Sequence, residues 1–226
     1  MDNGLTGYIK NLKLQKRCLS NIERLADDAF VLTIEHKHDF LPGQVLAITT
    51  DKSVSPRLYS ICSGNQENQL SILFNIKAGG MLTPALSKLK PGDELLVSNP
   101  FGSFLGDNQP AWWIAAGTGI APYRSMIRSG LGKHNMLIHG SRTTDGFFFE
   151  SEFMPFFGDR YVRCCSQETK DGVYPGRLTQ WLRGQSLIPP SLRYYLCGSA
   201  EMVVEVRDIL ISRGIGIENI MSEIYF

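Results

Sequence analysis

A glycine-rich turn at residues 117–122, with the sequence GTGIAP, has the composition of a phosphate-binding loop. It follows an apolar run at residues 111–116 and opens a segment with helical periodicity. Glycines in such a turn let backbone amides approach a phosphate at the positive end of the helix. The common dinucleotide fingerprint has a third glycine where Pro122 stands, so that form of the motif is absent. Taken alone, the turn is equally well explained as an ordinary strand-to-helix connection.

The segment RLYS at residues 57–60 could contact a planar, phosphorylated ligand. Arg57 offers a forked guanidinium for a phosphate, Tyr59 a flat ring, and Ser60 a small hydrogen-bond donor. In a strand, Arg57 and Tyr59 would share one face, and Leu58 and Ser60 the other. A surface arginine beside a packed tyrosine explains the same residues.

Two shorter glycine-containing segments are also candidate ligand contacts. Gly79 and Gly80 precede a predicted helix start, which is either a second anion site or a plain loop with Thr83 as its cap. Cys197 and Gly198 end an apolar run, and the carboxyl ends of parallel strands line ligand crevices. For the cysteine taken alone, a small buried side chain is the favoured explanation.

The chain ends in two aromatic residues, Tyr225 and Phe226, shortly after Glu223. Chain termini are usually polar and frayed, so aromatic side chains there need burial or a stacking partner. Packing as an edge strand is the alternative explanation.

The elements that must position these residues fall into two groups. Residues 1–106 contain short β-rich runs separated by Gly, Pro and Asn, which predicts an antiparallel β-barrel with one short helix. The predicted strands are at 30–35, 44–49, 57–63, 69–77 and 93–98, and the helix is at 81–89.

Residues 107–226 alternate compact apolar strands with amphipathic segments, which predicts an α/β domain with a doubly wound parallel sheet. The predicted strands are at 111–116, 135–140, 160–166 and 193–198, and the helices at 120–131, 150–157, 177–183 and 200–214. We expect the boundary between the two domains within the segment GDNQP at residues 106–110.

Composition excludes several classes of protein. The 226 residues carry 23 basic and 22 acidic side chains, a balance that argues against a nucleic-acid-binding protein. No apolar stretch approaches the roughly 20 residues needed to span a membrane, so membrane insertion is not expected. The five cysteines form no Cys-x-x-Cys pair, which argues against zinc and iron–sulfur sites. Their odd number and the absence of a signal peptide favour a cytoplasmic location.

The motifs RLYS, GGMLT, GTGIAP, LCGS and the terminal E-x-Y-aromatic occur in an order that resembles the ferredoxin–NADP reductase superfamily. The resemblance covers nearly the whole chain and is greatest to compact bacterial ferredoxin or flavodoxin reductases. It implies an FAD-binding barrel followed by an NAD(P)-binding domain. The implied activity is transfer of hydride between NADP(H) and the flavin, and of single electrons between the flavin and ferredoxin or flavodoxin.

The resemblance also implies flavin contacts in the first domain. Arg57 would hold the flavin pyrophosphate, Tyr59 would pack on the isoalloxazine ring, and Ser60 would lie near flavin N5. The helix start would bind the pyrophosphate as well. The remaining cofactor-binding residues implied here are Leu58, Asn75, Ile76, Lys77, Gly80, Met81 and Thr83.

In the second domain the resemblance implies the nucleotide contacts. Cys197 and Gly198 would lie at the nicotinamide, and Glu223 and Tyr225 would form the terminal pair, with Tyr225 over the other flavin face. Phe226 would be an extra terminal aromatic, either in part of the nicotinamide pocket or on the adenine side. The tail would thus return to the flavin. The pyrophosphate loop would consist of Gly117, Thr118, Gly119 and Pro122, and the implied catalytic set is Ser60, Cys197, Glu223 and Tyr225.

The preference for NADPH over NADH follows from cations after the strand at 135–140. The preference rests on Ser141 and Arg142, since a 2′-phosphate needs hydroxyls and cations. Arg142 matches an arginine that contacts the 2′-phosphate in bacterial relatives, and Arg177 matches another. Gln167 stands where relatives often have a further arginine, and Asp145 is nearby. NADP is therefore the expected nucleotide, with NAD less favoured.

Three alternatives remain open. The first is an NADH-dependent flavin or cytochrome reductase of the same superfamily, and the second is an electron-transfer subunit that is active only in a larger complex. The third is a nucleotide-binding regulatory module without redox chemistry. The basic residues Lys10, Lys13, Lys16 and Arg17 could meet an acidic electron carrier, or form a merely solvated terminus.

Overall fold

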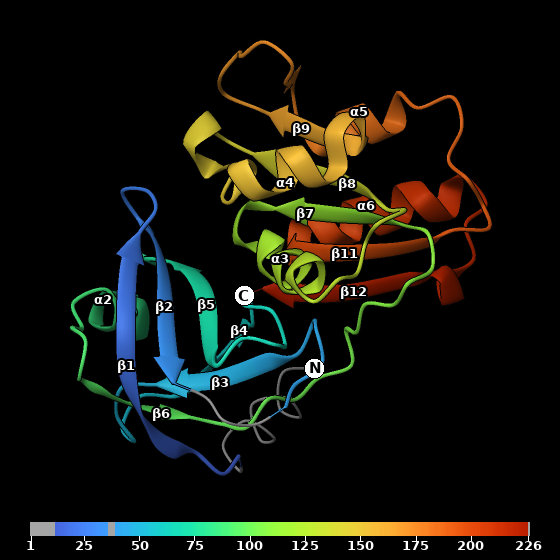
Figure 1. The fold of residues 1–226 in the computed structure, drawn as a ribbon. Coiled ribbons are helices and arrows are strands. Elements are labelled where there is room, and N and C mark those ends of the chain that lie inside the picture. The colour runs from blue at the N-terminus through green and yellow to red at the C-terminus, as the bar shows by residue number, and fades with distance from the viewer. Residues whose placement is uncertain (1–11, 36–38, 226) are drawn as a thin grey trace. The chain divides into compact units, whose positions relative to one another are not determined.

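The computed structural model describes residues 12–35 and 39–225. The chain divides into two compact units, Met1–Leu105 and Gly106–Phe226, and each has its own sheet (Figure 1). Among the described residues, no helix is long and apolar enough to cross a membrane.

The first unit is a six-stranded antiparallel sheet that closes on itself. Its strand order is β4-β3-β6-β1-β2-β5. An isolated antiparallel bridge between Ile61 and Ile72 joins the two end strands, and the amide of Cys62 donates to the carbonyl of Ser71 at 2.8 Å. The predicted antiparallel fold is therefore confirmed. The strands are β1 (Gln15–Arg24), β2 (Ala29–Glu35), β3 (Val45–Thr49), β4 (Arg57–Ser60), β5 (Gln69–Asn75) and β6 (Glu94–Val97).

Strand β1 is an element that the sequence patterns did not predict. It pairs with β2 on one side and with β6 on the other, so it lies inside the sheet. Of its ten residues only Leu19 is buried. The polar residues around Leu19 therefore hide the alternating pattern, and the strand is held by its ladders, by Leu19 and by Ile22, which is partly buried against the same core.

Helix α2 (Leu82–Leu86) is shorter than the predicted helix at 81–89. Leu82 and Leu86 are four residues apart, lie on one face and enter the barrel core. Beyond Ser87 the chain turns, and the amide of Leu89 donates to the carbonyl of Leu86 at 3.2 Å. Leu89 also packs against this core, so the predicted apolar face is present but its last part is formed by turns rather than by helix.

The second unit is a six-stranded parallel sheet of order β10-β9-β8-β7-β11-β12, which confirms the predicted α/β architecture. The tail forms β12, an edge strand in parallel register with β11. The strands are β7 (Ala111–Ala116), β8 (Met136–Ser141), β9 (Tyr161–Cys165), β10 (Tyr174–Pro175), β11 (Arg193–Ser199) and β12 (Ile220–Tyr225).

Helices cover both faces of this sheet (Figure 1). On one face α5 and α6 pack on Ile114, Ile138 and Leu196. On the other face the ring of Trp113 stacks on Tyr123 of α3, with centroids 5.2 Å apart, and meets Phe157 of α4 edge-on. The helices are α3 (Ala121–Arg128), α4 (Glu150–Phe157), α5 (Leu178–Arg183) and α6 (Ala200–Ser212).

Candidate flavin and nucleotide sites

The glycine-rich turn forms a short 3-10 segment, η1 (Gly117–Ile120), between β7 and α3. Gly117 has a φ of +54°, a conformation that other residues rarely adopt. A Cβ atom on Gly119 would overlap the carbonyl of Cys197 and lie 2.9 Å from the Cα atom of Gly198. The turn therefore packs directly on the backbone of β11, and its two glycines are needed for different reasons.

The start of α3 suits an anion. Pro122 lies in the first turn, where a missing amide hydrogen removes no helical bond. Neither η1 nor α3 has a side-chain cap on its first amides, and Thr118 is only half-buried. The amide of Ala121 donates to the carbonyl of Thr118, so the amides of η1 just before α3 are the donors that fit the pyrophosphate of a dinucleotide.

His139 is a site-adjacent residue that the sequence analysis missed. It is fully buried in β8, and its Nδ1 lies 3.0 Å from the hydroxyl of Tyr161. Burial lowers the pKa of its imidazole to about 3, and the backbone of Gly117 opposes this shift. A neutral histidine therefore lies beside the backbone of the glycine turn. A polar residue inside the apolar run MLIHG was the available signal.

Parallel register brings three predicted catalytic residues to the carboxyl ends of β11 and β12. Cys197 is paired with Glu223, and Ser199 with Tyr225. The thiol of Cys197 is fully buried and lies 4.0 Å from Oε2 of Glu223. The Tyr225 side chain also bonds to this thiol, and Gly198 separates Cys197 from the helix cap at Ser199.

The chemistry of Cys197 follows from this environment. Burial raises the pKa of the thiol well above its usual value, the Glu223 carboxylate raises it further, and the bond to Tyr225 opposes the shift. The thiolate is the reactive form of cysteine, so Cys197 is not a nucleophile at neutral pH. It can instead donate a weak hydrogen bond and fill space beside a ligand.

Backbone hydrogen bonds bring the predicted 2′-phosphate residues to one edge of the sheet. The carbonyls of Ser141 and Arg142 accept from the segment that follows β9, at 3.1 and 2.9 Å. In turn, the amide of Gly176 donates to the carbonyl of Cys165 at 2.7 Å, immediately before Arg177. Segments that follow three different strands are thus linked side by side.

The charges at this edge are mixed. Arg142 is exposed and pairs with no carboxylate in the described part of the chain. Arg177 pairs with Glu201 at 3.2 Å. Glu168 accepts the amide of Thr144 at 2.7 Å, and Asp145 is bonded to the Thr143 hydroxyl. Of the two guanidiniums, that of Arg142 therefore has no carboxylate partner among the described residues and that of Arg177 is paired. Three carboxylates lie in the same group of segments.

In the first unit, strand β4 carries the RLYS segment. Arg57 is exposed and makes no ion pair within residues 12–35 and 39–225. The ring of Tyr59 meets Phe74 edge-on at 6.3 Å, and burial raises the pKa of its hydroxyl. Ser60 is buried, and Leu58 is half-buried. The tyrosine is thus held by the barrel core, with the arginine open to a ligand.

The glycine segment before α2 differs from the predicted helix-start site. The Thr83 hydroxyl does not cap the helix but accepts the amide of Lys77 at 2.8 Å. The amide of Gly80 donates to the carbonyl of Lys77 at 2.9 Å, and Met81 at the helix start is 74% exposed. Because α2 has only five residues, its dipole adds little, and the segment is a tight backbone turn.

Some predicted flavin contacts are brought together and others are not. Lys77, Gly80 and Thr83 share the turn, and it follows Asn75 and Ile76 directly at the end of β5. Among the described residues, no hydrogen bond or ion pair joins Arg57 to this turn. An open guanidinium, a half-buried aromatic ring and a tight glycine turn fit the phosphates and ring of FAD. Phe226 lies outside the described residues.

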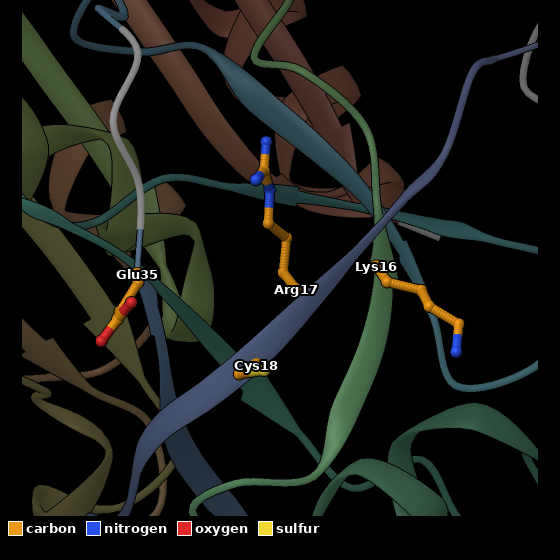
Figure 2. A pocket seen from close by; sticks show the side chains of 4 residues that line it. All are labelled: Lys16, Arg17, Cys18 and Glu35. Atoms are coloured by element: carbon orange, nitrogen blue, oxygen red, sulfur yellow. The ribbon is translucent and has the colours of Figure 1, made fainter.

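A cavity of about 290 Å³ opens beside β1 and β2, away from these candidates. Figure 2 shows Arg17 and Lys16 extending from β1 in different directions, with the Cys18 thiol on the same strand and Glu35 beyond it. Lys16 is bonded to Glu94 at 2.6 Å. None of the predicted cofactor-binding residues lines this cavity, and Lys10 lies outside the described residues.

Comparison with known proteins identifies both units. Residues 18–105 match the family model of the oxidoreductase FAD-binding domain, and residues 113–208 that of the oxidoreductase NAD-binding domain. A crystal structure of a ferredoxin NADP+ reductase from Neisseria gonorrhoeae, with bound FAD and NADP, has the same fold. Its TM-score is 0.86 at 20% identity, covering 95% of this chain and 99% of that one.

Curated relatives are also similar to this chain in sequence. The ferredoxin–NADP reductase of Azotobacter vinelandii is 30% identical over 250 residues, covering 90% of this chain and 93% of that protein. The toluate 1,2-dioxygenase electron transfer component of Pseudomonas putida is 29% identical over 223 residues, covering 91% of this chain but 66% of that protein. The chain is therefore an FAD- and NAD(P)-binding electron-transfer oxidoreductase, and it belongs to the ferredoxin–NADP reductase family.

Proposed function

We propose that this oxidoreductase uses NADPH in preference to NADH and exchanges single electrons with ferredoxin or flavodoxin. The names of its ferredoxin–NADP reductase relatives support a ferredoxin partner, and flavodoxin rests on the resemblance to compact bacterial reductases. FAD, when bound, supplies a group that takes an electron pair from the nicotinamide and releases electrons one at a time.

The observation that carries the proposal is the side of the parallel sheet at which its strands end. The carboxyl ends of β7, β8, β9, β11 and β12 all lie at this side, because parallel strands run in the same direction. The turn at Gly117–Ile120 offers amides to the pyrophosphate, and Cys197 with Glu223 and Tyr225 lines the proposed nicotinamide end. Arg142 follows β8 and Arg177 follows β10 at the start of α5, and both would receive the 2′-phosphate.

For the chain's own residues the main task is alignment. Arg57 and the turn of Gly80 and Thr83 would hold the FAD phosphates, while Tyr59 would pack on its ring. Ser60 would donate to the flavin, and the buried Cys197 thiol would shape the nicotinamide pocket without reacting. The proposed division of labour is a flavin domain at residues 1–106 and a nucleotide domain at 107–226.

A second candidate is an NADH-dependent electron-transfer component. Gln167 is neutral where a further cation would favour a 2′-phosphate, and Arg177 is already paired with Glu201. The Pseudomonas putida relative is named as an electron transfer component of a dioxygenase. We also propose a reducing, cytoplasmic location, supported by five cysteines that all lie within the described residues and form no disulfide there.

Anaerobic titration of the purified, FAD-loaded protein with NADPH and then NADH tests this function. The proposal expects bleaching of the visible flavin band at a much lower concentration of NADPH than of NADH, and reduction of an added ferredoxin or flavodoxin. Bleaching by NADH alone would instead support the second candidate. A flavin that neither nucleotide reduces would contradict both and favour a subunit that needs a larger complex.

A further inference from the structure

An ion pair between α5 and α6 already engages Arg177, one of the two cations that we propose to bind the 2′-phosphate. Nη1 of Arg177, the residue that caps α5, lies 3.2 Å from Oε1 of Glu201 in the first turn of α6. The two residues are 24 positions apart and meet because α5 and α6 pack on the same face of the sheet.

We infer that Glu201 is a specificity-determining residue that competes with the nucleotide 2′-phosphate for Arg177 and so narrows the preference for NADPH over NADH. This inference rests on the proposed function, since it takes Arg177 as a 2′-phosphate contact. The glutamate acts through Arg177 and leaves the contacts shared by both nucleotides unchanged.

The exposure of the pair makes competition effective. The side chains of Arg177 and Glu201 are 64% and 78% exposed, so water screens the pair and holds it weakly. A phosphate carries up to two negative charges and three acceptor oxygens, and can therefore draw the guanidinium away from one carboxylate. The displaced carboxylate then remains near the phosphate and repels it. Glu201 therefore lowers the affinity for NADPH.

Other charges at this edge do not cancel the effect. Arg142 is the second cation, and it has no carboxylate partner among the described residues. Gln167, whose amide donates to the carbonyl of Arg142 at 2.9 Å, brings no charge. Glu168 is engaged with the amide of Thr144 at 2.7 Å. Glu201 is therefore the carboxylate in direct contact with a proposed phosphate-binding cation.

The same pair of helices provides a matched control. Arg183 near the end of α5 pairs with Glu205, four residues after Glu201 in α6, at 2.7 Å. Replacing Glu205 by glutamine removes the same charge from the same helix and breaks the same kind of ion pair. Glu205 has no contact with the proposed nucleotide residues among those described.

The experiment measures binding of two probes to the full-length, FAD-loaded protein by isothermal titration calorimetry. The probes are 2′-phospho-5′-AMP, which carries the 2′-phosphate, and 5′-AMP, which lacks it. Glu201→Gln is expected to tighten binding of 2′-phospho-5′-AMP by roughly three- to fivefold, the size of one exposed ion pair. Binding of 5′-AMP should not tighten, and Glu205→Gln should change neither affinity.

Arg177→Ala separates this inference from the proposed function. In that background Glu201→Gln should no longer tighten binding of 2′-phospho-5′-AMP, because the contested guanidinium is gone. The inference is overturned if Glu201→Gln still tightens binding of 2′-phospho-5′-AMP without Arg177. It is also overturned if Glu201→Gln and Glu205→Gln bind 2′-phospho-5′-AMP with equal affinity. In both cases the proposed NADPH preference stands. If neither Arg142→Ala nor Arg177→Ala weakens 2′-phospho-5′-AMP relative to 5′-AMP, the proposed NADPH preference fails, and the inference fails with it.

Discussion

At the scale of single residues, burial decides what each side chain can do. Cys197 keeps its proton because it is fully buried beside Glu223, so a residue with a reactive functional group becomes a packing residue and weak donor. Arg57 and Arg142 remain exposed guanidiniums and are therefore available to anionic ligands. Residue type alone does not distinguish these cases, since the thiol would be reactive at an exposed position next to a cation.

Tyr225 gives the first residue-scale prediction. Its position beside Cys197 puts the ring where we propose that the nicotinamide lies. Tyr225→Ala removes this competitor, so NADPH and NADH should both bind more tightly, and the ratio between them should change. Dissociation constants from titration of the oxidised protein with NADP+ and NAD+ check this. Unchanged affinities and an unchanged ratio would contradict the proposed place of Tyr225, and Tyr225→Phe serves as the conservative control.

His139 gives a prediction about stability and pH. The unfolded histidine takes up a proton below about pH 6.5, whereas the folded one does so only near pH 3. The unfolded state therefore binds more protons between these values, and the free energy of unfolding falls as the pH is lowered from 6.5 towards 3. The contribution of this residue is about 1.4 kcal/mol per pH unit in that window.

Urea unfolding at pH 7, 6 and 5 measures the effect. The wild type should lose stability more steeply than His139→Gln, although the variant is less stable at neutral pH because Tyr161 loses its partner. Parallel pH profiles for the two proteins would show that the imidazole is not kept neutral by burial.

At the scale of elements, the glycine turn depends on contact between backbones. Gly119→Ala should destabilise the protein by about 2–4 kcal/mol, because its Cβ atom would overlap the carbonyl of Cys197, which cannot move without disturbing β11. Gly184→Ala is the control, since Gly184 has a φ of −74° and its Cβ atom would make ordinary contacts at 3.4 Å. Thermal unfolding of both variants tests this, and equal melting temperatures would be the contrary result.

The elements also differ in how well the sequence predicted them. The parallel strands β7, β8, β9 and β11 are apolar runs bounded by turn residues, so local pattern and structure agree. Strand β1 was missed because a single buried leucine leaves no alternation to detect. Helix α2 is shorter than predicted because the chain after Leu86 continues as turns, although Leu89 still packs on the core, and the spacing of leucines does not distinguish the two forms.

At the scale of the whole molecule, ligand binding should stabilise the fold by mass action. FAD at a hundred times its dissociation constant should raise the free energy of unfolding of the unit that binds it by about 2.7 kcal/mol. Arg57→Ala should need a higher FAD concentration for the same shift of the thermal transition, because the proposed phosphate contact is lost. Lys52→Ala, a nearby exposed cation with no proposed role, is the control. Equal FAD dependence in all three proteins would contradict the role of Arg57.

Local sequence patterns were sufficient to predict the two-domain architecture, the family and the candidate motifs, because each depends on residues close together in the chain. A glycine turn after an apolar strand, or an RLYS segment, carries its information within six residues. The aromatic residues at the chain end are a local pattern as well, and they predicted that the tail would form an edge strand or stack on a ligand. The structure shows the edge strand.

Which of these residues meet depends on the folding of the whole chain. Cys197 and Glu223 are 26 positions apart, His139 and Tyr161 are 22 apart, and Arg177 and Glu201 are 24 apart. Each contact depends on strand register or on how two helices pack, and these are set by the whole core rather than by local pattern. The folded chain is therefore needed to see that the Cys197 thiol keeps its proton, that His139 is neutral and that Arg177 is paired.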